Sequence, residues 1–422
     1  MKKILIITHY FPPRPGVGSI RPEGLAKYLP NFNWQPIVLT TTLPSSADKR
    51  YRVVETLYAK DFSYYIKKVF GLDPQLRLDQ QTKPVVIKTG KNSFLSKSME
   101  FIYGILNYPD EMKGWVPYAV TAGREIIKKE KVNAIISSSH PVTCHIIAQT
   151  LKKSYSIPWI ADLRDLWTQN PYYQYGSFRK YFERRLERKI FSSADALVTT
   201  SEPWAEQLRR IHRVKHIYSI VSGFDPEIMN DSKVTEDFTI THTGRFYDGK
   251  RDPSLLFKAL RDLIDAKLID FHSIRVRFWG STNHWLEKEI KRFNLEGVVK
   301  QYGMVSREES LRHQRESQIL LLLSWNNPEE VGTYTGKIFE YLASKRPILA
   351  IGPEGVISDL LKETRAGEQA LDVGMLKEIL LRYYDDFKKS KAVIYYGDMN
   401  RILKYSQVEM AKKFAELLAK IS

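Results

Sequence analysis

The feature that most constrains this chain is an alternation of short apolar runs with longer amphipathic segments over nearly all of its 422 residues. Such alternation is typical of parallel sheets with helices on both faces, because parallel strands need a long crossover connection. We therefore expect an α/β chain. The expected strands are residues 3–8, 36–41, 84–89, 132–138, 157–162, 194–200, 216–222, 238–245, 275–281, 298–303, 318–324 and 346–351.

The length and one polar segment predict two doubly wound domains in series. At 422 residues the chain is too long for one ordinary domain. Residues 222–237 are polar, contain Gly223 and Pro226, and have the character of a linker. We expect an N-terminal domain over 1–222, with an aromatic and basic insertion at about 43–118, and a C-terminal domain over 223–405. A final helix, 406–422, is expected to pack back on the first domain.

Net charge and cysteine content limit the classes of binding partner and the cellular compartment that we expect. The net charge is +17, which favours anionic partners such as nucleotide phosphates or an anionic membrane surface. No zinc-type cluster or nucleic-acid motif is present, so we expect no nucleic-acid partner. The single cysteine, Cys144, fits a reducing cytoplasm. The longest apolar run, Ile319–Leu323, is too short to span a bilayer, and the apolar start is interpreted as a strand.

Three loops that follow expected strands carry residues suited to a ligand. Ligands in open parallel sheets bind beyond the carboxyl ends of the strands, so two such sheets predict a site between the domains. In the first loop, Gly16 and Gly18 let the backbone approach a ligand. A tight turn that needs small residues explains this loop equally well.

The second loop, residues 241–253, opens the second domain. Gly244 ends a strand, Arg245 follows, and Lys250 is expected at the start of the next helix. Two cations that flank one loop can hold a diphosphate and balance charge on a departing one. A solvated charge run would have the same composition, but its position directly after a strand favours the binding interpretation.

The third loop leads into a helix that starts near Thr335 and Gly336. Free backbone N–H groups and the positive end of the helix dipole favour a phosphate there, by about 0.3–1 kcal/mol. Glu340 lies one turn further along. A carboxylate at that position would repel phosphate but suits a ribose diol.

Taken in order, these motifs resemble the family 4 retaining glycosyltransferases, which have the GT-B fold of two Rossmann-like domains. The resemblance covers nearly the whole chain apart from about 43–118. The matching segments are PPRPGVGSIR (12–21), SSSHPVTCH (137–145), IADLRDLW (160–167), G-R-x4-K (244–250), Gly280-Ser281, YGMVSREE (302–309), the strand into Ser324, and TGKIFEYLASKRPILA (335–350).

The resemblance implies a role for each matching residue. Arg245 and Lys250 would hold the donor diphosphate and act in catalysis. His140, in a loop after a first-domain strand, would touch the donor sugar. The residues implied in nucleotide-sugar binding are Gly16, Gly18, Gly244, Ser281, Gly303, Met304, Val305, Thr335, Gly336, Lys337 and, at the ribose, Glu340.

One position departs from the family pattern. The usual E-x7-E motif has an acidic residue eight positions before Glu340, and Gly332 stands there. Glu329 and Glu330 are close but out of register. That first Glu usually meets the donor sugar, so the departure concerns the sugar and leaves the nucleotide half of the motif intact.

The expected reaction moves a sugar from a nucleotide-sugar to a glycan or lipid-linked acceptor, in polysaccharide or glycolipid assembly, without a cofactor or metal. Asp165 is expected to position acceptor or sugar; it could equally cap the next helix or pair with Arg164. Two alternatives remain open: a nucleotide-sugar 2-epimerase of the same fold, and a non-catalytic nucleotide-binding scaffold, which Gly332 would favour.

The segment 179–191 predicts a helix with two different sides. Phe182, Leu186 and Ile190 recur on one face and are expected to join the core. Six basic residues lie between Arg179 and Lys189. Each basic side chain close to an anionic lipid surface contributes about 1 kcal/mol of binding free energy. We therefore expect a cytoplasmic protein that is peripheral at the inner face of the cell membrane.

Overall fold

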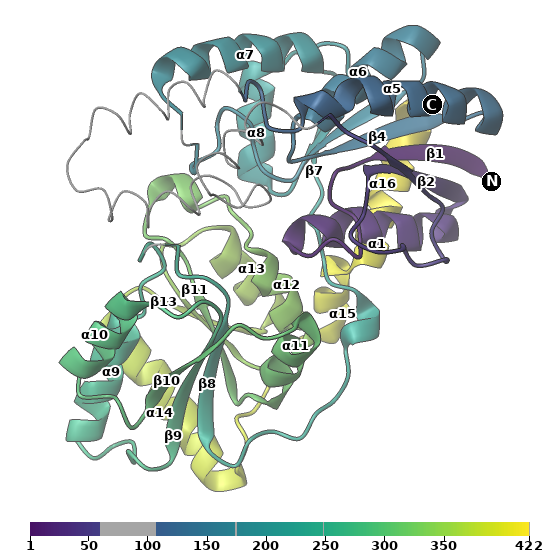
Figure 1. The fold of residues 1–422 in the computed structure, drawn as a ribbon. Helices are drawn as coiled ribbons and strands as arrows, with labels where there is room; N and C mark the ends of the chain where they lie inside the picture. The colour runs from purple at the N-terminus through teal and green to yellow at the C-terminus, as the bar shows by residue number, and fades with distance from the viewer. Residues whose placement is uncertain (60–106, 174, 248, 422) are drawn as a thin grey trace. The chain divides into compact units, whose positions relative to one another are not determined.

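The computed structural model describes residues 1–59, 107–173, 175–247 and 249–421. The chain forms two compact units (Figure 1). Unit 1 comprises Met1–Ile220 and Ala411–Ser422, and unit 2 comprises Val221–Met410. The division therefore falls at the start of the polar segment from which a linker was predicted.

Unit 1 contains a parallel sheet with strand order β3-β2-β1-β4-β5-β6-β7 in its described part. The strands are β1 (Lys2–Ile7), β2 (Trp34–Thr41), β3 (Val53–Thr56), β4 (Ala134–Ser139), β5 (Trp159–Leu163), β6 (Ala196–Thr199) and β7 (His216–Ser219). β3 was not predicted, because it lies in the segment 43–118 that the sequence indicated as an insertion. The strand expected at 84–89 lies outside the described residues.

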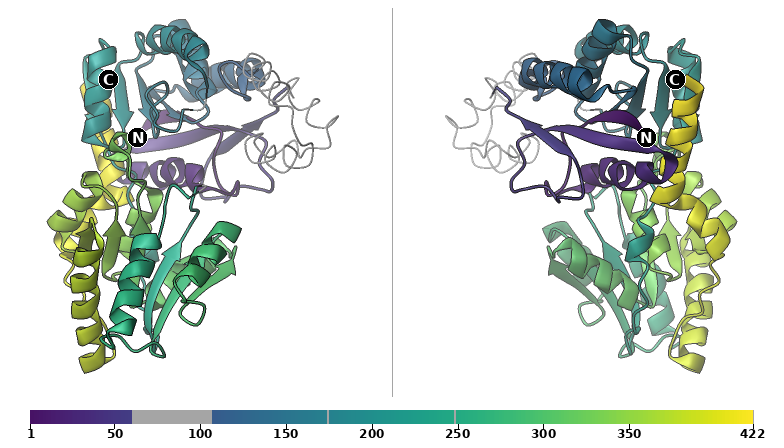
Figure 2. Two further views of the ribbon diagram at one scale, coloured as in Figure 1. Left: turned by 90° about the vertical axis from the view of Figure 1, so that its left-hand side faces the viewer. Right: turned by 90° about the vertical axis from the view of Figure 1, so that its right-hand side faces the viewer.

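Helices cover both faces of this sheet (Figures 1 and 2). They are α1 (Ile20–Tyr28), α5 (Val116–Glu130), α6 (Thr143–Tyr155), α7 (Ser177–Phe191), α8 (Glu202–Ile211) and the C-terminal α16 (Gln407–Ile421). The guanidinium of Arg21 in α1 lies 5.2 Å from the ring centre of Phe414 in α16. The last helix thus packs on α1 through its residues in unit 1.

Unit 2 repeats the design with the order β10-β9-β8-β11-β12-β13, again parallel. Its strands are β8 (Phe238–Thr243), β9 (Ile274–Trp279), β10 (Val299–Gly303), β11 (Ile319–Leu323), β12 (Ile348–Ile351) and β13 (Gly367–Ala370). Its helices are α9 (Ser254–Asp265), α10 (His284–Arg292), α11 (Arg307–Glu316), α12 (Gly336–Ala343), α13 (Val356–Thr364), α14 (Val373–Ser390) and α15 (Met399–Ile402).

The central strand β11 shows why its sequence is an unbroken apolar run. Its five residues are all buried, and successive side chains point to opposite faces of the sheet. Leu321 joins the core that contains α9 and α14, whereas Leu320 and Leu322 join the core that contains α12 and α13. A strand covered on both sides has no polar face, which is why the run carries no alternation.

Helix α7 differs from its predicted orientation. Ile190 is buried and Leu186 packs against the core as expected, but Phe182 is exposed. Its place inside is taken by Glu183 and Glu187, both fully buried. The prediction was wrong at Phe182 because buried hydrogen-bond partners accommodate the two carboxylates.

Candidate functional site

Each sheet reverses its strand order at one point, and several of the candidate residues lie in the loops at that point. In each strand order the chain runs outward from a central strand and then returns to the other side of it, so the switch falls between β1 and β4 and between β8 and β11. The loops that follow such strands diverge and leave room for a ligand at the carboxyl edge. The loops after β1 and β4 carry Gly16, Gly18 and His140, and the loop after β8 carries Gly244 to Lys250.

In unit 2, glycine allows the loops after β8 and β9 to approach closely. Gly244 has φ of +149° and Gly280 has φ of +151°, in the region that side chains rarely adopt. A Cβ added to Gly280 would lie 2.0 Å from the carbonyl oxygen of Gly244. Only glycine can therefore hold the two loops together at this edge of the sheet.

The two predicted cations, Arg245 and Lys250, lie on the loop after β8 and are both exposed. The sequence predicted that Lys250 lies at the start of a helix, and this prediction was wrong. Lys250 lies in a turn, and α9 begins only at Ser254. The loop is held over the sheet by Phe246, which is buried in the core. The ammonium of Lys250 lies 4.1 Å from the ring centre of Trp325, in the loop after β11. The cation-bearing loop therefore reaches the neighbouring loop across the switch point.

The start of α12 has unsatisfied hydrogen-bonding groups. Thr335 is the N-cap and is 7% exposed, yet its hydroxyl has no hydrogen-bond partner in the described residues. The hydroxyl oxygen of Thr333 is also buried and has no hydrogen-bond partner in the described residues. Buried hydroxyls are normally paired. Together with the positive end of the helix dipole at Gly336, these two hydroxyls provide donors suited to an anion.

Glu340 lies one turn into α12 and is 7% exposed. Its Oε2 accepts hydrogen bonds from Lys337 Nζ at 2.8 Å and from Gln314 Nε2 at 3.2 Å. Gln314 comes from α11 and also donates to Thr243 Oγ1 at 2.9 Å. Sequence reasoning missed Gln314, because only the fold brings α11 against α12 and the end of β8.

His242 is a second residue that the sequence did not reveal. It is buried at the end of β8, and its Nδ1 lies 2.9 Å from the carbonyl oxygen of Leu321, so that Nδ1 carries the proton. Its Nε2 has no hydrogen-bond partner in the described residues and faces the position that a Cβ of Gly244 would occupy. Burial, reinforced by Arg251 and Lys337, lowers the pKa of His242 to about 4. A neutral imidazole therefore lies beneath the cation-bearing loop.

The loop predicted to meet the nucleobase follows β10. Gly303 has φ of +86°, Met304 is 70% exposed, and Val305 is half-buried. Ser306 then starts α11 with a capping box that includes Glu309. The tight turn at Gly303 thus presents its backbone at the carboxyl edge before the next helix begins.

An aromatic stack lies beside that loop. The ring of Trp279 is parallel to those of Tyr302 and His313, with centroid distances of 4.3 and 3.9 Å. The predicted residue Ser281 is exposed two residues after Trp279, and its carbonyl oxygen accepts from the Asn283 side chain. The stack gives this edge of the sheet a rigid, flat wall.

The structure gives the residues near Gly332 a structural role. Glu330 is buried, its Oε2 accepts from the Trp325 backbone N–H at 2.9 Å, and its Oε1 lies 3.7 Å from Arg251. Its carboxylate therefore supports the loop after β11. Gly332 itself is buried and brings no side chain to the site.

In unit 1, Arg164 organises the carboxyl edge. Its guanidinium donates to the carbonyl oxygens of Gly18 at 2.6 Å, Ser139 at 2.6 Å and His140 at 3.0 Å. It therefore joins the loops that follow β1, β4 and β5. A Cβ at Gly18 would lie 2.9 Å from both Arg164 Nη1 and the Tyr10 ring, which explains why that position needs glycine. Gly16, with φ of +117°, is exposed.

Asp165 neither caps the next helix nor hydrogen-bonds to Arg164 in the described residues, although burial lowers the pKa of the Arg164 guanidinium and the charge of Asp165 acts to raise it. The described hydrogen bonds of Arg164 go to the three carbonyls, and none joins it to Asp165. The next helix, α7, begins at Ser177, so Asp165 does not cap it. Asp165 is exposed at the carboxyl end of β5, on the same edge of the sheet as His140.

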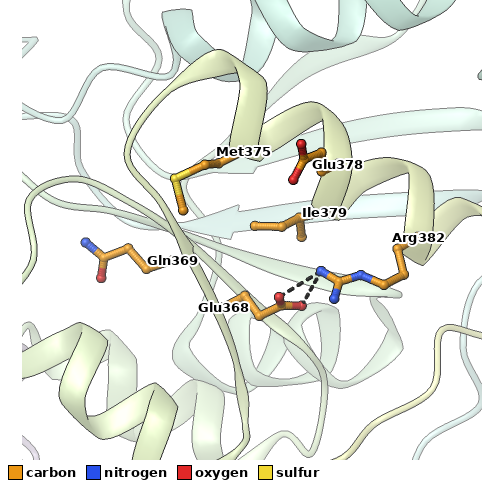
Figure 3. A pocket seen from close by; sticks show the side chains of 6 residues that line it. All are labelled: Glu368, Gln369, Met375, Glu378, Ile379 and Arg382. Carbon is orange, nitrogen blue, oxygen red and sulfur yellow. Dashed lines mark hydrogen bonds and ion pairs between the residues drawn. The ribbon is translucent and has the colours of Figure 1, made fainter.

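A separate pocket of about 420 Å³ lies between β13 and α14 (Figure 3). Glu368 and Arg382 form an ion pair within it. It is lined by Glu368, Gln369, Met375, Glu378, Ile379 and Arg382, so none of the predicted site residues belongs to it.

Comparisons with known proteins agree with this architecture. A family model described as Glycosyltransferase Family 4 matches residues 93–228. A search of curated proteins finds no match. The solved structures of similar fold include sucrose-phosphate synthase from Thermosynechococcus elongatus, with TM-score 0.67, 14% identity, and coverage of 100% of this chain and 99% of that one.

Two further structures show the range of proteins with this fold. Anabaena Alr3699/HepE, in complex with UDP and glucose, has TM-score 0.62 and 13% identity, with both chains covered fully. A structure from Listeria monocytogenes described as a UDP-N-acetylglucosamine 2-epimerase has TM-score 0.51 and 12% identity, with coverage of 98% and 95%.

Within the described residues, none of the helices combines the length and the apolar content that a bilayer crossing requires. The two parallel sheets with their helices form the two Rossmann-like domains of the GT-B fold. Fold and family match together indicate a glycosyltransferase of the GT-B fold.

Proposed function

We propose that this protein is a retaining glycosyltransferase that moves a sugar from a nucleotide-diphosphate sugar to a glycan or lipid-linked acceptor at the inner face of the cell membrane. Polysaccharide or glycolipid assembly would use such a step. The observation that carries the proposal is the edge of unit 2, where the Arg245–Lys250 loop and the start of α12 flank one switch point.

The positive charge at this edge of unit 2 favours the binding of a diphosphate. Arg245 and Lys250 bring two exposed cations on one loop. The start of α12 adds the helix dipole and the two buried threonine hydroxyls. Charge-assisted hydrogen bonds to phosphate are roughly twice as strong as neutral ones. The nucleotide would be recognised by Glu340 at the ribose hydroxyls and by the backbone of Gly303–Val305 at the base.

The reaction follows from the same groups. The bond between the anomeric carbon and the phosphate oxygen breaks, and its electron pair leaves with the diphosphate. Arg245, Lys250 and the helix dipole stabilise that charge, so no metal is required in the proposal. The acceptor hydroxyl attacks from the face that the diphosphate leaves and passes its proton to a phosphate oxygen. His140 would contact the donor sugar, and Asp165 would position sugar or acceptor.

A UDP-sugar is the first donor to test, because Anabaena HepE, which shares the fold, binds UDP and glucose. The 2-epimerase interpretation is the second candidate, since a structure described as such an enzyme also shares the fold. An epimerase needs no acceptor, so donor incubated alone separates the two: a 2-epimer would form with an epimerase and not with a transferase. A scaffold without turnover would bind UDP and form no product in either assay.

The central test measures binding and turnover together. Thermal shift with UDP, and transfer or slow hydrolysis of radiolabelled UDP-sugars with EDTA present, would be measured for the native protein and for Arg245→Ala and Lys250→Ala. We expect each variant to lose about 100-fold in kcat, as is typical when one group that stabilises leaving charge is removed. The matched control is Lys258→Ala, which removes an exposed cation from α9. Full activity in both variants would overturn the assignment of the diphosphate site.

A further inference from the structure

The outer face of α7 combines aromatic rings and cations and carries no exposed acid. Phe178, Tyr181 and Phe182 are 69%, 59% and 44% exposed. Their rings form one cluster, with centroids 4.9 Å apart for Phe178 and Phe182, and 5.4 Å apart for Tyr181 and Phe182. Single exposed apolar residues are ordinary, but three rings clustered at one end of a helix mark an interaction surface.

The acids of the helix are turned inward and hydrogen-bonded there. Glu183 accepts from Trp167 Nε1 at 2.8 Å and from Arg179 Nε at 2.6 Å. Glu187 accepts from the Thr168 hydroxyl, and its other oxygen lies 3.3 Å from His212 Nε2. Both carboxylates of α7 are therefore withdrawn from the surface.

The exposed charged side chains of α7 are consequently all basic. Arg184, Arg185, Arg188 and Lys189 are exposed, and none forms an ion pair with an acid in the described part of the chain. An ordinary surface helix intersperses both signs, because opposite charges four residues apart stabilise it. The cations follow the aromatic cluster along one helix, which Figure 1 shows running along the outside of unit 1.

We propose that this face of α7 is the surface by which the protein docks on an anionic lipid bilayer. Aromatic rings favour the boundary between headgroups and acyl chains, and cations favour the anionic headgroups beside them. The helix would lie in the plane of the membrane, with Phe178, Tyr181 and Phe182 inserted and the four cations at phosphate level. The inference deepens the proposed function. Only the presence of a sugar acceptor in that membrane rests on the proposed function; the docking surface itself does not.

Vesicle flotation of the full-length chain tests the surface without any sugar substrate. We expect the native protein to float with phosphatidylglycerol-containing vesicles at low salt, to be released at high salt, and not to float with pure phosphatidylcholine. The aromatic variant Phe178→Ser/Tyr181→Ser/Phe182→Ser and the charge variant Arg184→Gln/Arg185→Gln/Arg188→Gln/Lys189→Gln should each lose at least about tenfold in partitioning. Equal melting temperatures would show that both variants fold.

The matched control removes the same charge from exposed positions elsewhere in unit 1. Arg124→Gln, Lys128→Gln and Lys129→Gln on α5, with Lys153→Gln on α6, should leave vesicle binding within about twofold of native. The proposal fails if the native protein does not bind anionic vesicles, or if the control loses as much as the α7 charge variant. A dimer that the aromatic variant dissociates, without vesicle binding, would assign the face to a second copy and also overturn it. Loss of transferase activity in any assay would bear on the proposed function alone.

Discussion

The ammonium of Lys337 lies 2.8 Å from a carboxylate oxygen of Glu340, three residues along the first turn of α12. The two side chains that the sequence assigns to phosphate and to ribose thus contact each other. A ribose diol that hydrogen-bonds to Glu340 would compete with Lys337 for the carboxylate. Lys337 would then turn towards the phosphates, so that recognition of the ribose and of the diphosphate would be coupled.

Replacing Glu340 tests its assignment to the ribose. We expect Glu340→Gln to weaken UDP binding about 10- to 100-fold, because a hydrogen bond to a charged group contributes about 1.5–3 kcal/mol. Calorimetry with UDP and with 2′,3′-dideoxy-UDP gives the contrast: the native protein should prefer UDP, and the variant should bind both alike. Glu308→Gln, at an exposed position of α11, is the control. A variant that keeps the full preference for UDP would contradict the ribose assignment.

Gln314 is expected to act as a positioning residue, since it joins Glu340 to Thr243. Gln314→Leu keeps the volume but removes the donor, and it leaves the buried Glu340 carboxylate with one partner fewer. We expect KM for the donor to rise several-fold with kcat little changed, and the protein to lose about 1–3 kcal/mol of stability.

A shorter amide at position 314 tests whether the reach of the side chain matters as well as its polarity. Gln314→Asn should recover part of the stability but not the KM, because its shorter side chain cannot reach both α12 and β8. Steady-state kinetics and thermal unfolding give the two readouts. An unchanged KM in Gln314→Leu would assign Gln314 to packing alone.

Buried His242 predicts a loss of stability in mild acid. Its pKa is about 4 in the folded chain and 6.5 when exposed, so below pH 6.5 the unfolded chain takes up the proton first. The free energy of unfolding is unaffected by His242 protonation above pH 6.5. It declines as the pH falls from 6.5 towards 4, by about 1.4 kcal/mol per pH unit at most. Unfolding monitored between pH 7 and 5 should show a smaller pH slope for His242→Gln. His284→Gln, whose side chain is 97% exposed, should leave the slope unchanged.

The ion pair between Arg21 and Asp162 should be the most sensitive point of unit 1. Both side chains are buried, Arg21 Nη2 lies 2.7 Å from Asp162 Oδ1, and Ser138 Oγ donates to Asp162 Oδ2 at 2.8 Å. Asp162→Ala would remove the carboxylate that balances the charge of the buried Arg21 guanidinium, so we expect a loss of about 3–5 kcal/mol.

Two comparison variants isolate the cause of that loss. The double variant Arg21→Met/Asp162→Leu should be less destabilised than Asp162→Ala, because no charge is left without its partner. Asp48→Ala, which removes the exposed pair with Arg50, should change stability far less than Asp162→Ala does. Calorimetric unfolding would measure all three. Equal losses in the single and double variants would show that packing, rather than charge, dominates at this site.

Local sequence was sufficient for most of the described parallel strands, though not for β3 and β13. The alternation of strand-like and helix-like segments predicted strands such as β8 and β11, and the loops that carry the predicted site residues follow these strands. β13 was missed because its sequence, Gly367–Ala370, has only one fully buried residue and no apolar run. Lys250 was misplaced because the chain makes a further turn before α9, closed by hydrogen bonds from the backbone N–H groups of Lys250 and Arg251 to Tyr247 and Phe246.

Sequence by itself determined the alternating α/β order, the positions where glycine must follow a strand, and the helix start at Thr335. Each depends on neighbours in the chain, through periodicity and backbone freedom. Only the tertiary structure decided that Glu183 and Glu187 face inward, that Gln314 holds Glu340, and that Arg164 joins three loops. Helical spacing fixes the angle between side chains on one helix, but the buried hydrogen-bond partners that choose the inward face, such as Trp167 and His212, come from other parts of the fold.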